Sequence, residues 1–409
     1  MLRGAFSVFA LTAALAAAPA SAQERAVGLR PQMSSVEGGI WAETDKAEAE
    51  ARTRADLNTD PALNAYVRSV MCKVAGPYCP DLRVYVMDRP AMNASMAPNG
   101  YSEVWSGLLL RATDEAEFAY VLGHEVSHFT ENHSIEAHGA QKTRANVALA
   151  ATVVVAVAGA ASAASAGTAS EAQSIMDAAG NTIDLIYYVQ MASLFRFSRE
   201  QEAQADILGQ RKAAAAGYDV SAAADSWRGL IAETQGSDFK RVRASQTRVS
   251  VFASHPLSAD RIEALDAQAK TLGAGGERGR ERHRAAIRPH LAVWLRDDLR
   301  KRDFGQTLVV IDRLAAGGED LGVLNYYRGE AYRMRRGEGD LPRAKAAYLA
   351  AAAQTDAPAA TWRELGDIHR RDGDLPAART AYETYLAKAP QAEDAWLVQD
   401  SLSSLAHGN

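Results

Sequence analysis

The chain has 409 residues, 47% of them hydrophobic, and a formal net charge of −5. This length favours two domains over one, and the apolar fraction is ample for packed cores. The nearly balanced charge leaves no basic surface of the kind that binds nucleic acid, so nucleic-acid partners are excluded.

Residues 1–22 predict a secretory signal peptide. Arg3 supplies a positive start, residues 5–18 form an apolar stretch, and Ala-Ser-Ala at 20–22 is typical of a cleavage site. A membrane anchor is the alternative, but the apolar stretch is short for a bilayer. No cysteine lies near the cleavage site, so we expect an exported protein without a lipid anchor.

Cys72 and Cys79 are the two cysteines of the chain. In an oxidising compartment, a pair that closes a short loop containing Gly76 and Pro77 predicts a disulfide. A metal-binding pair is the alternative, although no further cysteine exists to complete such a site.

Several elements are predicted before the first long helix. Residues 23–57 are polar with weak periodicity and predict an N-terminal arm. Apolar residues at helical spacing over 61–70 predict a helix, whereas the alternating segment 82–87 predicts a strand. Residues 93–109, with a Pro-Asn-Gly turn at 98–100, predict a hairpin that leads into the next helix.

That helix is predicted to begin at Thr113, whose hydroxyl can cap the first turn. Asp114, Glu115 and Glu117 follow it, at positions where the helix dipole favours acidic side chains. Two histidines, four residues apart, lie further along the same helix.

The motif His124-Glu125-Val126-Ser127-His128 carries the functional prediction. Residues four apart on a helix share one face, so His124 and His128 can bind one cation. Glu125 can then reach a water on that cation and act as a general base. The alternative is that the motif occurs by chance on an ordinary helix. The residues that accompany it therefore decide between a metal site and a chance match.

A zinc hydrolase needs a third protein ligand and an open position for water. The subclass with Gly and His at positions 131 and 134 is excluded, because Glu131 and Ser134 stand there. His133 lies one position away and is predicted to face solvent or to end the helix.

The alternative third ligand is a glutamate on a separate helix. Glu202 and Asp206 are four residues apart, so Glu202 can bind zinc while Asp206 accepts the far N–H of a ligand histidine. Ala203 and Ala205 keep the flanks small for close helix packing. Glu200 fits an ordinary acidic surface.

Residues 145–170 contain no charged side chain, and Ala, Ser, Gly and Thr dominate the segment. Such a composition is marginal for membrane insertion. We therefore expect a helical insertion rather than a membrane span.

An internal repeat follows a Gly- and Arg-rich linker. Residues 339–348 recur at 373–382, an offset of 34 residues that is typical of tetratricopeptide repeats. A helix pair near 291–314 and a last helix near 392–405 would flank the two copies, because such repeats need neighbours. The residues at expected repeat positions are Trp362, Leu365, Gly366, Ala378, Tyr382 and Pro390.

The chain resembles the HtpX/BepA-type zinc metallopeptidases, metallopeptidase family forty-eight, over about residues 60–270. Three ordered motifs carry the resemblance: the His-Glu-x-x-His motif at 124–128, the Ser-Arg-x-x-Glu-x-x-Ala-Asp block at 198–206, and His255-Pro256 followed by Arg261. Ser254 departs from the family, where Thr is frequent.

The resemblance implies one Zn²⁺ per chain held by His124, His128 and Glu202, with Glu125 as the base that passes a proton to the leaving amine. His255 would donate to the oxyanion of the tetrahedral intermediate or close onto zinc as a fourth ligand, and both roles stay open.

One further residue and one strand complete the expected site. The resemblance makes Arg261 a structural salt-bridge partner in the surroundings of the ligands. The strand around residues 93–97 is expected to pair with an extended peptide substrate.

The predicted organisation is a signal peptide (1–22), an arm (23–57), a peptidase domain (58–270), a linker (271–282) and a helical domain (283–407). The expected fold is α+β and mostly α: a gluzincin-type zinc peptidase domain with a small β-sheet, followed by an α-solenoid of tetratricopeptide repeats.

An exported member with C-terminal repeats is most similar to the periplasmic BepA-like branch. That likeness implies a zinc metalloendopeptidase that acts on unfolded or misassembled envelope proteins in the periplasm. The repeats would bind a protein partner, with the outer-membrane assembly machinery as a candidate, and membrane association is not required. The alternative is a repeat-based chaperone or adaptor with a latched or weakly active zinc site.

Overall fold

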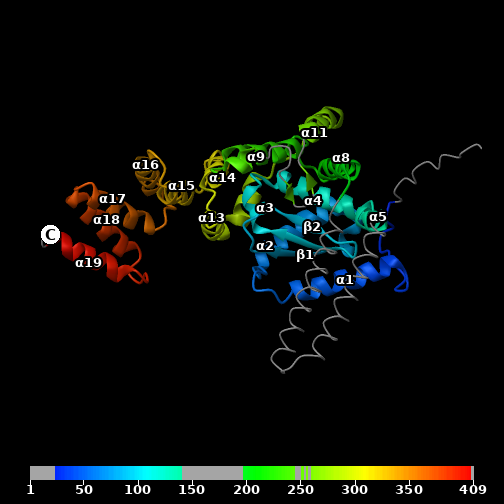
Figure 1. Ribbon diagram of the computed structural model, residues 1–409, viewed down its shortest axis with the longest axis horizontal. Helices are drawn as coiled ribbons and strands as arrows, with labels where there is room; N and C mark the ends of the chain where they lie inside the picture. Colours follow the sequence, from blue (N-terminus) through cyan, green and yellow to red (C-terminus); the bar gives the residue numbers. More distant parts are fainter. Residues whose placement is uncertain (1–23, 141–196, 245–249, 253–254, 257–258, 407–409) are drawn as a thin grey trace, which may run out of the picture.

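The computed structural model of the chain is mostly helical and contains two small β-sheets (Figure 1). The predicted signal peptide at 1–22 and the uncharged segment at 145–170 lie outside the residues that it describes. In the described part of the chain, no helix is both long and apolar enough to cross a membrane. The described residues are 24–140, 197–244, 250–252, 255–256 and 259–406.

The segment predicted as an arm contains helix α1 (Val36–Ala51), which packs on the sheet. Glu48 of α1 is buried and accepts hydrogen bonds from Arg83 Nη2 at 2.6 Å and from Tyr85 Oη at 2.7 Å. Burial opposes ionisation of Glu48, but these hydrogen bonds outweigh it and lower its pKa to about 2. The helix was missed because polar Thr44 and Glu48 occupy buried positions and blur the apolar period.

Helix α2 (Pro61–Ala75) confirms the helix expected over 61–70 and continues into the 3₁₀ turn η1 (Gly76–Asp81). Cys72 and Cys79 form a disulfide across this junction. The bond therefore fixes the end of α2 to the residues that lead into the sheet.

The three-stranded sheet has the order β1-β3-β2. Strand β1 (Arg83–Met87) pairs in parallel with β3 (Tyr101–Trp105), and β2 (Ala94–Met96) pairs antiparallel with β3. The predicted hairpin is confirmed, but its second strand ends at Trp105, where helix α3 (Ser106–Arg111) begins. Strand β2 is left as one edge of this sheet.

The histidine-bearing helix is α4 (Glu115–Thr130), and every one of its residues is buried. Asp114 caps it by accepting a hydrogen bond from the Glu117 backbone N–H at 2.9 Å. The predicted cap Thr113 is therefore one residue early, and its hydroxyl instead donates to the Glu117 carboxylate at 2.9 Å. The negative charge of a carboxylate at this position is also stabilised by the positive end of the helix dipole.

Further elements complete the region around α4. Figure 1 shows α8 and α9 beside α4, with α11 beyond them. In chain order, the elements of this region after α4 are α5 (His133–Ala140), α8 (Arg199–Ala215), α9 (Ala222–Gly236), α10 (Lys240–Arg243), β4 (Ser250–Phe252), β5 (His255–Pro256) and α11 (Ala259–Leu272).

The residues predicted as a linker pack against the start of α4. Arg278 Nε lies 2.7 Å from Asp114 Oδ2, and Arg282 Nη2 lies 3.1 Å from Glu115 Oε1. One hydrophobic cluster runs from Leu63 to Leu324 and so crosses the predicted boundary. The next elements are α12 (Arg280–Ile287), the 3₁₀ turn η2 (Arg288–His290), α13 (Leu291–Leu299) and α14 (Phe304–Ala315).

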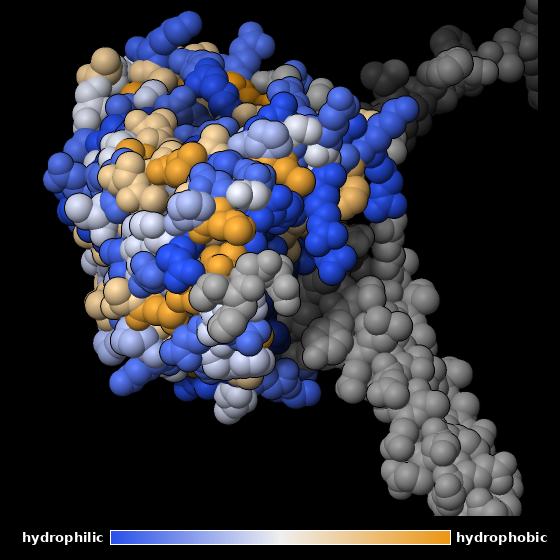
Figure 2. Space-filling view, turned by 90° about the vertical axis from the view of Figure 1, so that its left-hand side faces the viewer, coloured by the Kyte–Doolittle hydropathy of each residue, from blue (hydrophilic) through white to orange (hydrophobic). Residues whose placement is uncertain are grey.

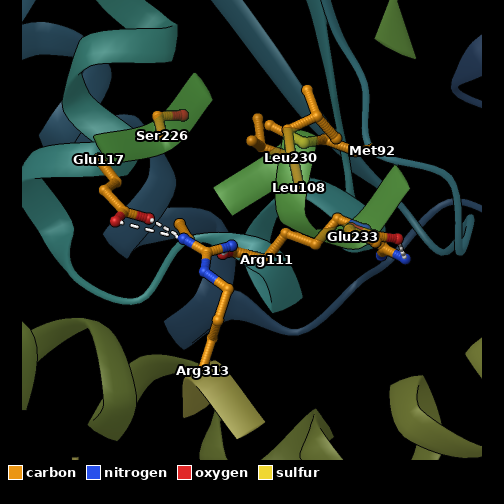
Figure 3. Close-up of a pocket in the computed structure, with 9 residues that line it drawn as sticks. Met92, Leu108, Arg111, Glu117, Ser226, Leu230, Glu233 and Arg313 are labelled. Carbon is orange, nitrogen blue, oxygen red and sulfur yellow. Dashed lines mark hydrogen bonds and ion pairs between the residues drawn. The ribbon is translucent and has the colours of Figure 1, made fainter. Parts of the chain in front are cut away.

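A group of charged side chains, most of them buried, joins α14 to α4 around a small pocket (Figure 3). Arg313 Nη2 of α14 lies 3.1 Å from Glu117 Oε2, and Arg111 Nη2 lies 2.8 Å from Glu233 Oε1 of α9. Arg111 Nη2 also lies 2.7 Å from Asp298 Oδ1 of α13. Helix α14 is thus bonded to the helix that carries the histidines, and α13 is bonded to α3, which precedes α4.

The C-terminal helices form antiparallel pairs that extend away from the sheet (Figure 1). A Cβ added to Gly329 would stand 2.5 Å from the Tyr348 ring, and one on Gly366 would stand 2.4 Å from the Tyr382 ring. The two copies of the sequence repeat therefore make the same close contact. The helices are α15 (Leu321–Arg335), α16 (Asp340–Ala352), α17 (Ala360–Arg371), α18 (Leu375–Lys388) and α19 (Ala395–Ala406).

The flanking helices expected near 291–314 and 392–405 are present as α13, α14 and α19. On the face at the end of this helical array, hydrophobic residues lie scattered among hydrophilic ones (Figure 2). The assignment of these pairs as tetratricopeptide repeats stays a prediction.

Candidate metal centre

Helices α4 and α8 bring three potential ligands together. The Nε2 atoms of His124 and His128 lie 3.0 Å apart. Glu202 Oε2 lies 3.6 Å from His124 Nε2, and Glu202 Oε1 lies 3.7 Å from His128 Nε2. All three side chains are buried, with their ligand atoms within 4.8 Å of one another. The three residues expected from the sequence as metal ligands thus lie together on two facing helices.

Asp206 lies behind His124, one turn beyond Glu202 on α8. Its Oδ1 is 3.0 Å from His124 Nδ1, which directs Nε2 of the same ring toward Glu202. Burial opposes ionisation of Asp206, but hydrogen bonds from Arg261 and His124 lower its pKa to about 2. Burial likewise disfavours the charged form of His124, but Asp206 outweighs this effect and raises the pKa of the imidazole.

Arg261 of α11 bridges the two acidic residues. Its Nη1 lies 3.1 Å from Glu202 Oε2, and its Nε lies 2.5 Å from Asp206 Oδ2. Two buried carboxylates face one buried guanidinium, which compensates much of the cost of burying their charge. Arg261 thus forms salt bridges, the role that the family resemblance implied for it, and its partners are Glu202 and Asp206.

Tyr120 and Trp227 also belong to this group, and the sequence did not reveal them. Tyr120 Oη donates to Asp206 Oδ1 at 2.7 Å, and Trp227 Nε1 donates to Tyr120 Oη at 2.8 Å. The Arg261 guanidinium lies 4.3 Å above the Trp227 ring. Tyr120 precedes His124 by one helical turn, so its spacing in the sequence could have indicated that it lies on the same face. Trp227 comes from α9, and its sequence position gives no such indication.

His133 is fully buried, so the prediction that it faces solvent is wrong. The chain turns at Asn132, whose φ is 56°, and this turn directs His133 back toward the site. His133 Nδ1 lies 2.9 Å from His128 Nδ1, while its Nε2 lies 3.3 Å from Gln204 Oε1. His133 therefore contacts the Nδ1 atom of His128 as Asp206 contacts the Nδ1 atom of His124. In both rings this nitrogen points away from the other ligands.

Small residues allow the close approach of α4 and α8, but they are not the expected pair, Ala203 and Ala205. Ala205 is buried, but Ala203 is exposed. The close contact involves Gly123 and Gly209, because a Cβ on Gly209 would stand 2.7 Å from the His124 backbone nitrogen.

The remaining predicted residues differ in what the structure says of them. Glu125 is buried, and its charge acts on His124, the next residue of α4. Glu200 is exposed at the start of α8, as its assignment to the surface predicts. His255 lies in β5, which pairs antiparallel with β4, but its side chain is outside the described residues, as is Ser254.

The donor set fits a divalent metal of the zinc type. Two imidazole nitrogens and one carboxylate converge in a buried site, and each imidazole has a partner on its other nitrogen. Three protein ligands of this kind leave a position for water, which is the pattern of catalytic rather than structural zinc sites.

Comparisons with known proteins agree with this site. Residues 57–269 match the model of peptidase family M48. The chain is 25% identical to a putative beta-barrel assembly-enhancing protease of Vibrio cholerae over 217 residues, which is 52% of the chain and 40% of that protein. It is 29% identical to the mitochondrial metalloendopeptidase OMA1 of Danio rerio over 183 residues, 45% of the chain and 34% of that relative.

The human mitochondrial metalloendopeptidase OMA1 is 27% identical over 186 residues, 45% of the chain and 31% of the relative. The matches thus span two fifths or less of each of these relatives, whereas the family model covers more than half of this chain and includes all three potential ligands. The chain belongs to peptidase family M48.

Proposed function

We propose that this protein is a zinc-dependent metalloendopeptidase. The observation that carries the proposal is the buried convergence of His124, His128 and Glu202, in a chain of a peptidase family. The chemistry that bound zinc supplies is a water that ionises near pH 7 (pKa about 7) and the polarisation of a carbonyl.

Glu125 follows His124 directly and is the candidate general base. Its carboxylate would accept a proton from the attacking water and donate it to the amine nitrogen as the peptide bond breaks. The buried surroundings of Glu125 keep bulk water away from this proton. His255 is proposed to donate to the oxyanion, and its second proposed role is to close onto zinc as a fourth ligand in a resting state.

The edge strand β2 is the proposed binding place for the substrate backbone. It pairs with β3, no strand of the described residues pairs with its other side, and α4 contacts it. An extended peptide can add to such an edge through main-chain hydrogen bonds, which suits unfolded chains of varied sequence. We therefore propose unfolded or misassembled proteins as the substrate class.

The place of action is proposed to be the periplasm, with the helix pairs from α15 onward as a docking surface for a protein partner. The predicted export signal supports the compartment, and the relative named as a beta-barrel assembly-enhancing protease supports outer-membrane assembly as the setting. The 34-residue period supports a tetratricopeptide-type array for docking.

A chaperone or adaptor with a silent zinc site is the competing function. The geometry of the site disfavours it, because the ligands, their partners and Glu125 are all present and buried together. A decayed site would lose the base before the ligands, since only the base is dispensable for binding metal.

The mature protein, incubated with casein or a short unstructured peptide, tests the proposal. We expect cleavage that stops when a chelator removes the metal and returns when zinc is added back. A metal-replete preparation that cleaves neither substrate would favour the adaptor.

A further inference from the structure

The N-terminal segment of the described chain lies on the C-terminal end of α4. Arg25 is only 3% exposed, and its backbone N–H donates to the Thr130 carbonyl at 2.7 Å. Its own carbonyl accepts a hydrogen bond from Tyr78 Oη at 2.5 Å. Thr130 is the last residue of α4, and the last carbonyls of a helix have no partner inside the helix. Arg25 thus supplies a partner from far away in the sequence.

The Arg25 side chain holds Asn132, which lies two residues after this end. Its Nη1 donates to Asn132 Oδ1 at 2.8 Å, and its Nη2 donates to Glu37 Oε1 at 3.2 Å. The guanidinium lies 4.6 Å from the centre of the Phe129 ring and 5.3 Å from that of Trp41. A buried guanidinium costs free energy unless it is paired, and here two acceptors and two aromatic faces surround it.

Asn132 connects this contact to the metal centre. It lies two residues after the end of α4 and occupies the left-handed region at φ 56°, so the direction of the next residue depends on it. The next residue is His133, whose Nδ1 lies 2.9 Å from His128 Nδ1. A contiguous series of contacts therefore runs from Arg25 through Asn132 and His133 to a proposed metal ligand.

We propose that Arg25 is a positioning residue of the metal centre. By holding Asn132, it keeps His133 against His128, so that Nε2 of His128 points at the metal. The inference rests on the proposed function, because it assumes that His128 binds metal. Loss of a residue that orients a metal-binding histidine typically weakens metal affinity by about 10- to 100-fold.

Zinc affinity of the full mature chain, measured by competition with a chromophoric chelator, tests this role. Arg25→Met should weaken zinc binding about tenfold, and His133→Gln by at least as much. The double variant should bind no more weakly than His133→Gln alone, because both changes interrupt one series of contacts. Cobalt-substituted Arg25→Met should also show a shifted visible absorption band.

Arg30→Met is the matched control. Arg30 belongs to the same segment and also lies 5.3 Å from the Trp41 ring, but it is exposed. This variant should keep the wild-type zinc affinity and cobalt spectrum. If Arg25→Met does not fold, Arg25→Lys keeps the charge without the guanidinium fork and should show weaker zinc binding in a folded chain.

The outcomes separate this inference from the function on which it rests. A wild-type chain that binds no zinc would remove the metal site and the role of Arg25 with it. A wild-type chain that binds zinc, beside a folded Arg25 variant of unchanged affinity and cobalt spectrum, would overturn the role of Arg25 alone. Purely additive effects of Arg25→Met and His133→Gln would overturn the proposed series of contacts.

Discussion

Gly123 of α4 and Gly209 of α8 meet where the two metal-binding helices cross. A Cβ on Gly123 would stand 2.8 Å from the Gly209 carbonyl oxygen, and one on Gly209 would stand 2.7 Å from the His124 backbone nitrogen. Backbone therefore faces backbone, with no side chain that could move aside. This contact sets the distance from His124 to Glu202, because Glu202 lies two turns from Gly209 on the same helix.

Gly209→Ala should force the helices apart and weaken both the fold and the zinc site. We expect a loss of about 1–3 kcal/mol in the free energy of unfolding, as for other overpacked contacts, and weaker zinc binding. Chemical denaturation and chelator competition measure the two effects. Gly39→Ala in α1 is the control, because nothing lies within 4 Å of the added Cβ. Equal stability and zinc affinity in Gly209→Ala and Gly39→Ala would contradict this account of the crossing.

Glu202→Ala should lose bound zinc, whereas Glu200→Ala should keep one zinc per chain. Glu202 is buried 3.6 Å from His124 Nε2, but Glu200 is exposed on another face of α8. Metal analysis after dialysis, with circular dichroism as the check on folding, compares the two. The opposite order of zinc content would show that the third ligand is misassigned.

Local patterns in the sequence predicted the centre of the site. Residues four apart share a helical face, so His124 with His128, and Glu202 with Asp206, could each be paired before any tertiary contact was known. The alternating strand and the Pro-Asn-Gly turn likewise follow from local periodicity and turn chemistry.

What the sequence did not predict depends on contacts between distant segments. His133 was expected to face solvent or to end the helix, because the turn at Asn132, which Arg25 contacts, cannot be read from helical spacing. Trp227 reaches the site only through the packing of α9 on α4. The residues after 271 have the composition of a linker, yet Arg278 pairs with buried Asp114, a contact that composition does not encode.

Cys72 and Cys79 should be disulfide-bonded in protein recovered from the cell envelope. The bond closes the loop that carries Tyr78, whose hydroxyl donates to the Arg25 carbonyl at 2.5 Å. Alkylation of free thiols followed by mass spectrometry reports the redox state. Two fully reduced cysteines in that material would count against both the bond and the proposed compartment.

His255→Ala separates two roles of this histidine by the sign of the effect. We expect turnover on a short unstructured peptide to fall by about a hundredfold or more, as when an oxyanion donor is removed. A short peptide avoids any contribution from docking to the helical array. A clear rise in turnover would instead show that His255 mainly closes onto zinc as a fourth ligand.

The most direct test of the account is Glu125→Gln, measured for both zinc content and peptide turnover. The amide fills the same space but cannot accept a proton from water, so the variant should keep one zinc per chain and lose peptide cleavage. Near wild-type turnover in a zinc-loaded Glu125→Gln preparation would contradict the assignment of Glu125 as the base, and with it the proposed mechanism.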